Sequence, residues 1–399
     1  MIRPLSLEVA QERLLGRVMP LGSETVPVAD AAGRYSSGPL LARRTQPAAD
    51  CSAMDGFAMR ADDLGGPWRT VGESAAGHPF TVPLKPGEAV RISTGALLPP
   101  AAGAILLQEQ ALHEVGTLRL APDGAPSPHH IRLAGLDFCE GEPLLPAGAL
   151  LTPARMALLL AGGHGAVEVG RRPALAVLES GDELAGNPQA CPPHRVPASN
   201  GAMLAAMAAP LVSSLTRVGP VPDRLDALAA ALEQAQSCDV LVTSGGASVG
   251  EHDLIRPALE AWGARIDFWR IAIRPGKPLL VARRGEQVIL GLPGNPVSSF
   301  VTAFLFLLPL LRRLGGSSGP LPVGVALPLA APLPPVGERM EFLRGLIEPE
   351  GVVPLEQQDS STLASLGAAD CLIQRLARSP SAKPGELVTV YWIHNDGMA

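Results

Sequence analysis

A short segment rich in carboxylates directly follows an apolar run in the middle of the chain. Residues 179–183 read Glu-Ser-Gly-Asp-Glu. Carboxylate oxygens are the ligands that Mg²⁺ prefers, and a carboxylate also serves as a general base. An acidic turn in which Asp182 caps a neighbouring element is the alternative, and the sequence leaves both interpretations open. The candidate site residues of this segment are Ser180, Gly181, Asp182 and Glu183.

A second segment, residues 243–253, combines glycines with hydroxyls and reads TSGGASVGEHD. Glycines let a backbone approach an anion, hydroxyls and free N–H groups donate to it, and a following helix adds a favourable dipole. The spacing matches neither G-x-x-x-x-G-K-[ST] nor G-x-G-x-x-G, which excludes ordinary P-loop NTPase chemistry. A structural Gly-Gly turn, with Asp253 as a simple helix N-terminal acid, is the alternative. The candidate site residues are Ser244, Gly245, Gly246, Ser248, Gly250 and Asp253.

The third segment, residues 291–299, reads GLPGNPVSS and precedes an apolar helical stretch. Two prolines stiffen the loop, and Ser298 or Ser299 can cap the helix. A rigid turn explains these residues as well as a ligand crevice does. The candidate site residues are Pro293, Gly294, Asn295, Pro296 and Ser298.

Three cations lie between the second and third segments, in residues 270–278, RIAIRPGKP. Alternation predicts that Arg270 and Arg274 share one face of an extended segment, and the Pro-Gly turn presents Lys277. Such a group suits phosphate or another tetrahedral oxyanion. A solvated basic strand is the alternative.

Nearer the N-terminus, residues 51–58 (CSAMDGFA) and 91–96 (RISTGA) each hold one candidate, Asp55 and Thr94. No histidine lies close to Cys51 in the sequence, so cysteine-protease chemistry has no local support. Asp55 with its following glycine is equally explained as a turn. The histidines show no H-E-x-x-H spacing, which argues against a zinc site.

The three loops belong to a region, residues 171–316, in which strand and helix patterns alternate. The expected strands are 174–178, 239–243 and 287–290, and the expected helices are 199–209, 223–237, 253–262 and 297–314. This alternation predicts parallel βαβ units with helices on both faces of the sheet. Because loops at the carboxyl ends of parallel strands meet at one crevice, we expect the three loops to converge.

The rest of the chain has different patterns. Residues 5–19 predict a helix, and residues from Pro153 predict another that stops at a glycine. Residues 45–130 predict short strands with no helix, and residues after 316 predict a further all-β domain. The expected boundaries are 1–44 and 131–170 for a linker domain in two parts, 45–130 for an inserted domain, 171–316 for the α/β domain and 317–399 for the C-terminal domain.

Composition limits the function further. A net charge of −6 with 4% aromatic residues argues against a general nucleic-acid binder. The five cysteines are far apart without a C-x-x-C, which excludes a disulfide framework and indicates a reducing cytosol. The longest apolar stretch, 300–311, falls short of the ~20 residues of a membrane span and predicts a buried core helix. We therefore expect a soluble, cytoplasmic protein without a signal peptide.

Taken in order and spacing, the motifs resemble those of the MoeA family of molybdopterin molybdenumtransferases. They are SAMDGFA, RISTGA, IRLAGLDF, SGDEL, TSGGASVGEHD, FWRIAIRPGKP and GLPGNPVSS, and the resemblance extends from the first helix to GELVTV at 385–390. It implies a multidomain α/β plus β fold, with a three-layer α/β molybdopterin-binding domain, an inserted β-rich domain, a split linker domain and a C-terminal β-barrel-like domain. It also implies an elongated homodimer whose cleft lies between the α/β domain of one subunit and the inserted domain of the other.

The resemblance implies that molybdate is inserted into the dithiolene of adenylylated molybdopterin, with Mg²⁺-dependent release of AMP. By motif, Glu183 and Asp253, with Asp182, match positions that handle Mg²⁺ and phosphate, and Asp223 matches an acid before the next helix. The cations Arg270, Arg274 and Lys277 would attract the oxyanion, whereas Asp55 would act from the partner subunit, with Thr94 matching the threonine near it. Transient partners would be the molybdopterin adenylyltransferase and molybdoenzymes or their chaperones.

Departures from the family pattern are few, namely Ser180 for the commoner threonine, Ala247 for valine, Phe57 for tyrosine, and arginine for lysine at 270 or 274, which keeps the charge but changes the donor geometry. Phe57 removes a phenol and any hydrogen bond that it would make. Two other functions remain as alternatives. A molybdopterin adenylyltransferase would be a lone α/β domain of less than half this length, and a non-catalytic carrier or scaffold would not need the site residues.

Overall fold

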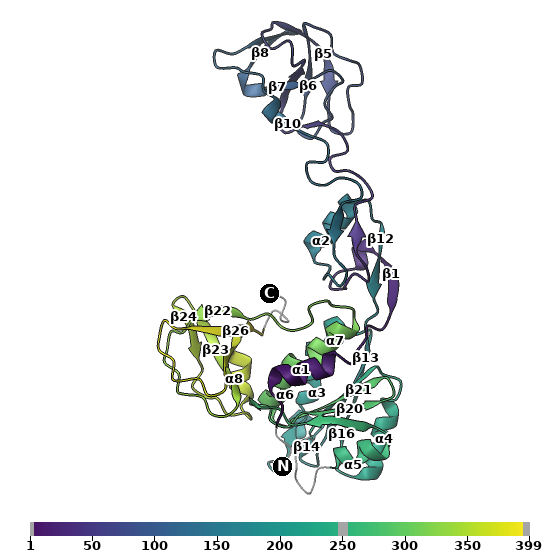
Figure 1. The fold of residues 1–399 in the computed structure, drawn as a ribbon, viewed down its shortest axis with the longest axis vertical. Coiled ribbons are helices and arrows are strands. Elements are labelled where there is room, and N and C mark those ends of the chain that lie inside the picture. The colour runs from purple at the N-terminus through teal and green to yellow at the C-terminus, as the bar shows by residue number, and fades with distance from the viewer. Residues whose placement is uncertain (1–3, 246–253, 394–399) are drawn as a thin grey trace.

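The computed structural model describes residues 4–245 and 254–393. The molecule is elongated (Figure 1), with a small β domain at one end and an α/β domain beside a second β domain at the other. A slender region that contains β1 and β12 joins the two ends.

The α/β domain is built on one six-stranded sheet in the order β16-β13-β17-β21-β20-β18. Its strands are β13 (Ala174–Ser180), β16 (Ser214–Val221), β17 (Val240–Ser244), β18 (Arg265–Trp269), β20 (Leu280–Arg284) and β21 (Gln287–Leu292). The first four in the sheet are parallel, whereas β20 and β18 are antiparallel to their neighbours. The three expected strands are confirmed. The sequence did not reveal β16 and β18, edge strands that carry polar and charged residues, or β20, the hairpin partner of β21.

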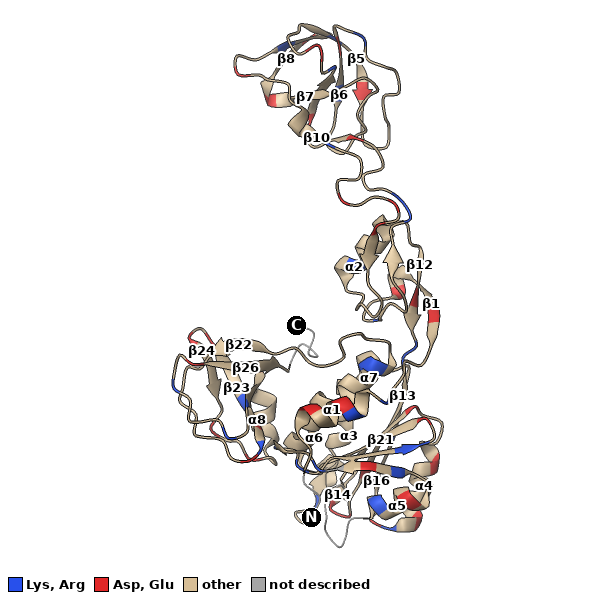
Figure 2. Ribbon diagram, in the orientation of Figure 1, with Lys and Arg blue, Asp and Glu red and all other residues tan. Residues whose placement is uncertain are grey.

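Helices cover both faces of this sheet. One face holds α1 (Leu7–Leu15), α3 (Asn200–Ala208), α6 (Pro296–Thr302) and α7 (Leu308–Leu314), and the other holds α4 (Leu225–Gln234) and α5 (Ile255–Ala261). Alternate residues of β13 serve the two cores, since Leu175 and Val177 pack toward α3 whereas Ala176 and Leu178 pack toward α4. Figure 2 shows charged positions on α1, α4 and α5 and none on α3 and α6. The layered α/β arrangement is therefore as expected.

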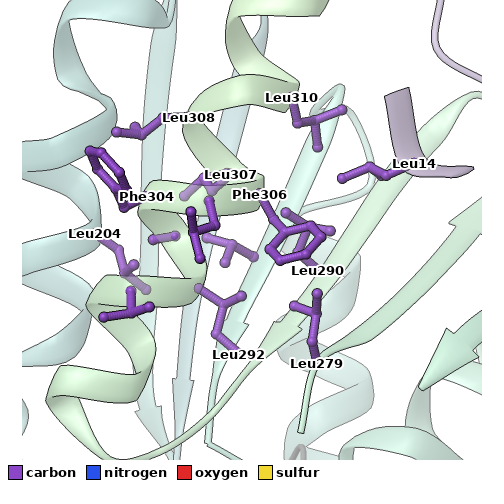
Figure 3. Close-up of a cluster of buried hydrophobic side chains, with 14 of the residues drawn as sticks. Leu14, Leu204, Leu279, Leu290, Leu292, Phe304, Phe306, Leu307, Leu308 and Leu310 are labelled. Atoms are coloured by element: carbon purple, nitrogen blue, oxygen red, sulfur yellow. The ribbon is translucent and has the colours of Figure 1, made fainter. Parts of the chain in front are cut away.

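The apolar stretch forms one long buried helix, with a π-helical turn at Ala303–Leu307 between α6 and α7. Phe306 points into the core beside Leu290 of β21, whereas Phe304 lies on the other side of the helix (Figure 3), where its ring packs against that of Tyr391 with 6.0 Å between centroids. Pro296–Leu314 is long and apolar enough to cross a membrane, with a mean hydropathy of 1.6, but 89% of its apolar window is buried inside the protein. The expected core helix is confirmed.

A side chain from α1 compensates for the proline inside this helix. In an α-helix the N–H of residue 309 would donate to the carbonyl of Leu305, but Pro309 has no N–H. The Nε2 of Gln11 donates to that carbonyl instead, at 2.9 Å, and Gln11 is 8% exposed. The N-terminal helix is therefore part of what holds the long helix in place.

Helix α1 is shorter than the expected 5–19. It begins after Ser6, whose Oγ accepts a hydrogen bond from the N–H of Val9 at 3.3 Å, and it ends at Gly16. Leu5 pairs instead with Ile271 as a β-bridge. Capping at Ser6 thus separates the bridge from the helix.

The small β domain at the far end is one six-stranded sheet in the order β7-β4-β6-β5-β9-β8. Its strands are β4 (Gly56–Met59), β5 (Trp68–Ser74), β6 (Glu88–Ile92), β7 (Ala104–Leu107), β8 (Ala111–Glu114) and β9 (Thr117–Leu120). Residues 45–130 hold no α-helix, as expected. The connecting region pairs β1 (Ser23–Pro27) with β12 (Ala166–Gly170), so the chain leaves and returns side by side, and it carries α2 (Pro153–Ala161).

The C-terminal domain is a strongly curved sheet in the order β19-β23-β25-β26-β22, with β24 paired to β23. Its strands are β19 (Ile273–Arg274), β22 (Val325–Pro328), β23 (Met340–Glu348), β24 (Gly351–Pro354), β25 (Cys371–Arg375) and β26 (Leu387–Trp392). A bridge between Leu329 and Val352 brings the far edges together. The expectation of an all-β domain is wrong in one respect, because helix α8 (Leu363–Ala368) packs its Leu366 into the core of the α/β domain.

Candidate active site

The loops after β13, β17 and β21 meet at a cavity of about 790 Å³ at the carboxyl edge of the sheet. The predicted convergence of the three loops is therefore confirmed. The predicted site residues that line it are Ser180, Glu183, Ser244, Gly245, Pro293, Gly294, Asn295, Pro296 and Ser298. Close packing of the loops requires a glycine at 245, where φ is 97° and a Cβ would lie 2.5 Å from the carbonyl oxygen of Ser180.

Asn200, at the first turn of α3, ties these loops together and was not among the predicted residues. Its Nδ2 donates to the Oγ of Ser244 at 2.9 Å and to the carbonyl of Gly294 at 2.7 Å. Asn200 is 9% exposed and lines the cavity. Its position at the start of the expected helix 199–209 is the only sequence signal that marks it.

Glu179 is the second residue that the predictions missed, although it begins the acidic segment. It is 6% exposed, at the end of β13, and lines the cavity together with Glu183. Glu183 itself is exposed, and its carboxylate folds back over Gly181, where a Cβ would lie 2.4 Å from Oε2. These two carboxylates are the only charged groups among the described residues that line this cavity.

Asp182 has a different position from the one expected of a metal ligand. It is exposed and does not line the cavity, and its Oδ1 accepts a hydrogen bond from the N–H of Asp223 at 3.1 Å. This is the capping role that the sequence offered as the alternative. Within residues 4–245 and 254–393, no three His, Cys, Asp or Glu side chains are grouped to hold a metal ion. Gly246, Ser248, Gly250 and Asp253 lie outside the described residues.

A second cavity of about 700 Å³ adjoins the first and shares Pro278 and Ser298 with it. Among its described lining, the basic side chains are those of Arg274, Lys277, Arg339, Arg344 and Arg375, and the acidic ones are those of Glu341, Glu356 and Asp359. Arg274 forms an ion pair with Glu341 at 3.1 Å, and Lys277 is exposed. Charge is thus divided between the two cavities, with carboxylates in the first and an excess of cations in the second.

Arg270 does not share this wall, and the extended segment expected at 270–274 is wrong. Arg270 has a φ of 98°, and its backbone N–H donates to the carbonyl of Leu279 at 3.2 Å. Only Ile273–Arg274 forms a strand, β19. The turn at Arg270 separates it from Arg274, so the two side chains do not lie on one strand face.

The C-terminal domain closes the cavities through a loop at residues 358–362. Arg344, which is 1% exposed, donates from Nη1 to the carbonyl of Asp359 and to Thr362 Oγ1, both at 3.1 Å. Burial lowers the pKa of this guanidinium. The loop in turn contacts the α/β domain, because Asn295 Nδ2 donates to Ser360 Oγ at 2.8 Å and the N–H of Val297 donates to the Ser360 carbonyl at 3.1 Å. Residues of two domains therefore define one site.

Asp55 and Thr94 are brought together but lie in the small β domain, at the other end of the molecule from the cavities (Figure 1). Asp55 Oδ1 accepts hydrogen bonds from the Thr94 N–H at 2.6 Å and from Thr94 Oγ1 at 3.0 Å. These bonds hold the pKa of the Asp55 carboxyl below its usual value. The pair is an ordered, exposed acid without a route to the cavities of its own chain.

Comparison with known proteins agrees with this arrangement. The chain matches the MoeA N-terminal region (domain I and II) over residues 5–163, a probable molybdopterin binding domain over 176–313 and the MoeA C-terminal region (domain IV) over 326–393. A molybdopterin molybdenumtransferase of Haemophilus influenzae is 32% identical over 97% of this chain and 98% of its own length. One of Bacillus subtilis is 29% identical over 98% of this chain and 95% of its own length.

Solved structures give the same result. The molybdopterin biosynthesis MoeA protein of Pyrococcus horikoshii superposes with a TM-score of 0.78 at 29% identity, covering 97% of this chain and 98% of that one. The likeness extends over every domain, including the small β domain and the C-terminal sheet. The chain therefore belongs to the MoeA family of molybdopterin molybdenumtransferases.

Proposed function

We propose that this protein inserts molybdenum into molybdopterin, using molybdate and adenylylated molybdopterin and releasing AMP in a Mg²⁺-dependent step. The observation that carries the proposal is the pair of adjoining cavities, which share Pro278 and Ser298. One offers carboxylates, hydroxyls and amides to a phosphorylated organic substrate, and the other offers cations to MoO₄²⁻. A reaction in which the dithiolene of the substrate takes up the metal of an oxyanion while AMP leaves the same substrate needs both surfaces within reach of one another.

The first cavity supplies groups for the substrate and its phosphate. Ser180 is 3% exposed, and its Oγ is a buried atom without a hydrogen-bond partner in the described part of the chain. A buried hydroxyl of this kind is satisfied at little cost by a ligand oxygen. Ser244 Oγ is held in place by Asn200 and lines the same wall.

Mg²⁺ fits the donor set of this cavity. It keeps several waters in protein sites and is bound by one or two carboxylates together with substrate phosphates, so a complete protein cage is unnecessary. Glu183 offers an exposed carboxylate at the rim of the cavity. When bound there, Mg²⁺ would neutralise the charge that develops on the phosphate as AMP leaves.

The second cavity would hold molybdate. Lys277 is a flexible point charge at the wall next to Ser298, and Arg274 is pre-oriented by its ion pair with Glu341. Ammonium and guanidinium groups donate short, charge-assisted hydrogen bonds to a tetrahedral dianion. Lys277 directly precedes Pro278, which lines both cavities.

We further propose that the protein acts as a homodimer, in which Asp55 and Thr94 of one subunit complete the site of the other. Asp55 is exposed, its pKa is lowered by hydrogen bonds from Thr94, and it lies at the far end of the molecule from its own cavities, so it could reach such a cavity only in a second copy. The reaction would take place in the cytoplasm, in keeping with the five free cysteines. Its substrate must come from an adenylyl-transfer enzyme, and its product would pass to molybdoenzymes or their chaperones.

The test measures AMP release from adenylylated molybdopterin, with and without molybdate and Mg²⁺. Release should require both ions and should fall by at least about 100-fold in Glu183→Gln, the usual loss for a single electrostatic group in an active site. Glu286→Gln is the matched control, because Glu286 is exposed in the β20–β21 turn at the opposite edge of the sheet.

The other candidate functions give different results in this assay or in a parallel one with ATP and unmodified molybdopterin. Tight binding of the adenylylated compound without AMP release would show a carrier or scaffold. Consumption of ATP with unmodified molybdopterin would show an adenylyltransferase. Either result would refute the proposed transfer of molybdenum.

A further inference from the structure

Glu179 is a buried carboxylate that the reaction described above does not use. It is 6% exposed, and of the described residues none donates a hydrogen bond or forms an ion pair with its side chain. Because it follows Val177 on the same face of β13, it points toward α3 and into the first cavity. Removing a carboxylate from water is unfavourable unless it gains a partner, so a bound ligand is the natural source of one.

The first turn of α3 is shaped around this carboxylate. A Cβ on Gly201 would lie 2.2 Å from Oε2 of Glu179 and 2.7 Å from its Cδ. Any larger residue at 201 would therefore displace the Glu179 side chain. The space beside Gly201 is occupied by the carboxylate itself, which is thereby held at the cavity wall.

The surroundings of Glu179 favour an uncharged ligand that donates two hydrogen bonds over a metal ion. Apart from Glu183, the other described residues that line the cavity are uncharged, and Ser180, Ser199, Asn200 and Ser244 lie on the adjoining elements. The positive end of the α3 dipole stabilises a carboxylate and disfavours a cation. Glu179 belongs to no group of three metal-ligating side chains in the described part of the chain.

We propose that Glu179 accepts the two parallel hydrogen bonds of a 2-amino-4-oxopteridine ring, from its 2-amino group and its N3–H. This inference rests on the proposed function, which supplies a pterin as the substrate. The two N–H groups of that ring edge are spaced like those of a guanidinium, and a carboxylate accepts such a pair through both oxygens. The rest of the substrate would then extend from the buried end of the cavity toward Glu183 and the cationic cavity.

The test compares two ring compounds that differ at one position. Pterin carries the 2-amino group, whereas lumazine has a carbonyl there and would present an acceptor to the carboxylate. The wild-type protein should bind pterin about 10- to 100-fold more tightly than lumazine, the value of one charge-assisted hydrogen-bond pair, as measured by NMR titration. In Glu179→Gln this preference should fall below about threefold, because the neutral amide both donates and accepts.

A second variant distinguishes loss of the Glu179 contact from misfolding of the protein. Gly201→Ala adds a Cβ where Oε2 now lies, yet it raises helix propensity, so it should reduce the pterin preference while the melting temperature holds. The two substitutions should be non-additive, since either one removes the same contact. Gly367→Ala is the matched control, because Gly367 lies in α8 with no atom near its added Cβ.

Several outcomes would overturn the proposal. Equal binding of pterin and lumazine by the wild type, no binding of either, or an unchanged preference in Glu179→Gln would each do so. A weaker affinity for Mn²⁺ in Glu179→Gln, with the pterin preference intact, would make Glu179 a metal ligand instead. The proposed function is tested separately, by AMP release from the wild-type protein. If the wild type releases AMP but Glu179→Gln keeps the pterin preference, only the proposal for Glu179 is refuted. If Glu179→Gln loses the preference but the wild type releases no AMP, only the transferase function is refuted.

Discussion

Two inactive variants should restore activity when they share a dimer. The perturbation is Asp55→Asn in one chain and Glu183→Gln in the other, because these residues lie at opposite ends of the molecule. If each site takes Glu183 from one subunit and Asp55 from its partner, a mixed dimer has one intact site and one doubly defective site. Subunits that assemble at random give one half mixed dimers, so about a quarter of all sites should be intact.

The assay co-expresses the two variants at equal levels and measures AMP release per subunit. Each variant alone should be inactive, and the mixture should give about a quarter of the wild-type rate. In a control, wild type is mixed with the double variant; its mixed dimers should be wholly inactive, which again leaves about a quarter of the wild-type rate. A mixture of the single variants that stays as inactive as each alone, although mixed dimers form, would refute a site shared between subunits.

Three further results are expected. Lys277→Met should raise the molybdate concentration for half-maximal AMP release by about 10- to 100-fold, which is the value of one charge-assisted hydrogen bond. Lys277→Arg should be intermediate, and the Mg²⁺ dependence should be unchanged in both variants. A parallel change in Mg²⁺ dependence would contradict a role in oxyanion binding. Gln11→Met should lower the free energy of unfolding by about 1–3 kcal/mol, because it leaves the buried Leu305 carbonyl unpaired; an unchanged urea midpoint would argue against this. Thr94→Val should raise the pKa of Asp55 in a carboxyl-carbon NMR titration. Because the pKa of Asp55 is depressed in the folded protein, the stabilisation by Thr94 is present above the ordinary pKa of ~3.9 and is lost at lower pH. An unshifted titration would show that the Thr94 hydroxyl does not contribute.

The sequence predicted the sheet and its crevice where local pattern and global fold agree. The strands β13, β17 and β21 are central and buried on both faces, so they appear as continuous apolar runs with loops at defined ends. The convergence of their loops then follows from parallel pairing alone. In edge strands such as β18, charged residues alternate with apolar ones, and no local sequence signal distinguishes such a strand from a loop.

Residues whose role depends on tertiary contacts escaped prediction. Glu179 reads as part of an acidic turn, and only the position of α3 shows that it is buried beside Gly201. Asn200 reads as the start of a helix, although its amide joins two other loops. Alternation placed Arg270 beside Arg274, but a positive φ at Arg270 breaks the strand, and alternation carries no information on such a turn.

The division of charge between the two cavities depends on the C-terminal domain. The α/β domain alone supplies the carboxylates of the first cavity but only Arg274 and Lys277 of the second, whose other cations come from residues 339–375. Arg344 holds the loop that carries Ser360, and Ser360 is bonded to Asn295 on the α/β side, so the two walls are fixed relative to one another. If the two cavities have the roles proposed above, an isolated α/β domain would retain the substrate cavity but would lose three of the five cations that line the second one. The proposed insertion of molybdate would then need the C-terminal sheet as well as the α/β domain.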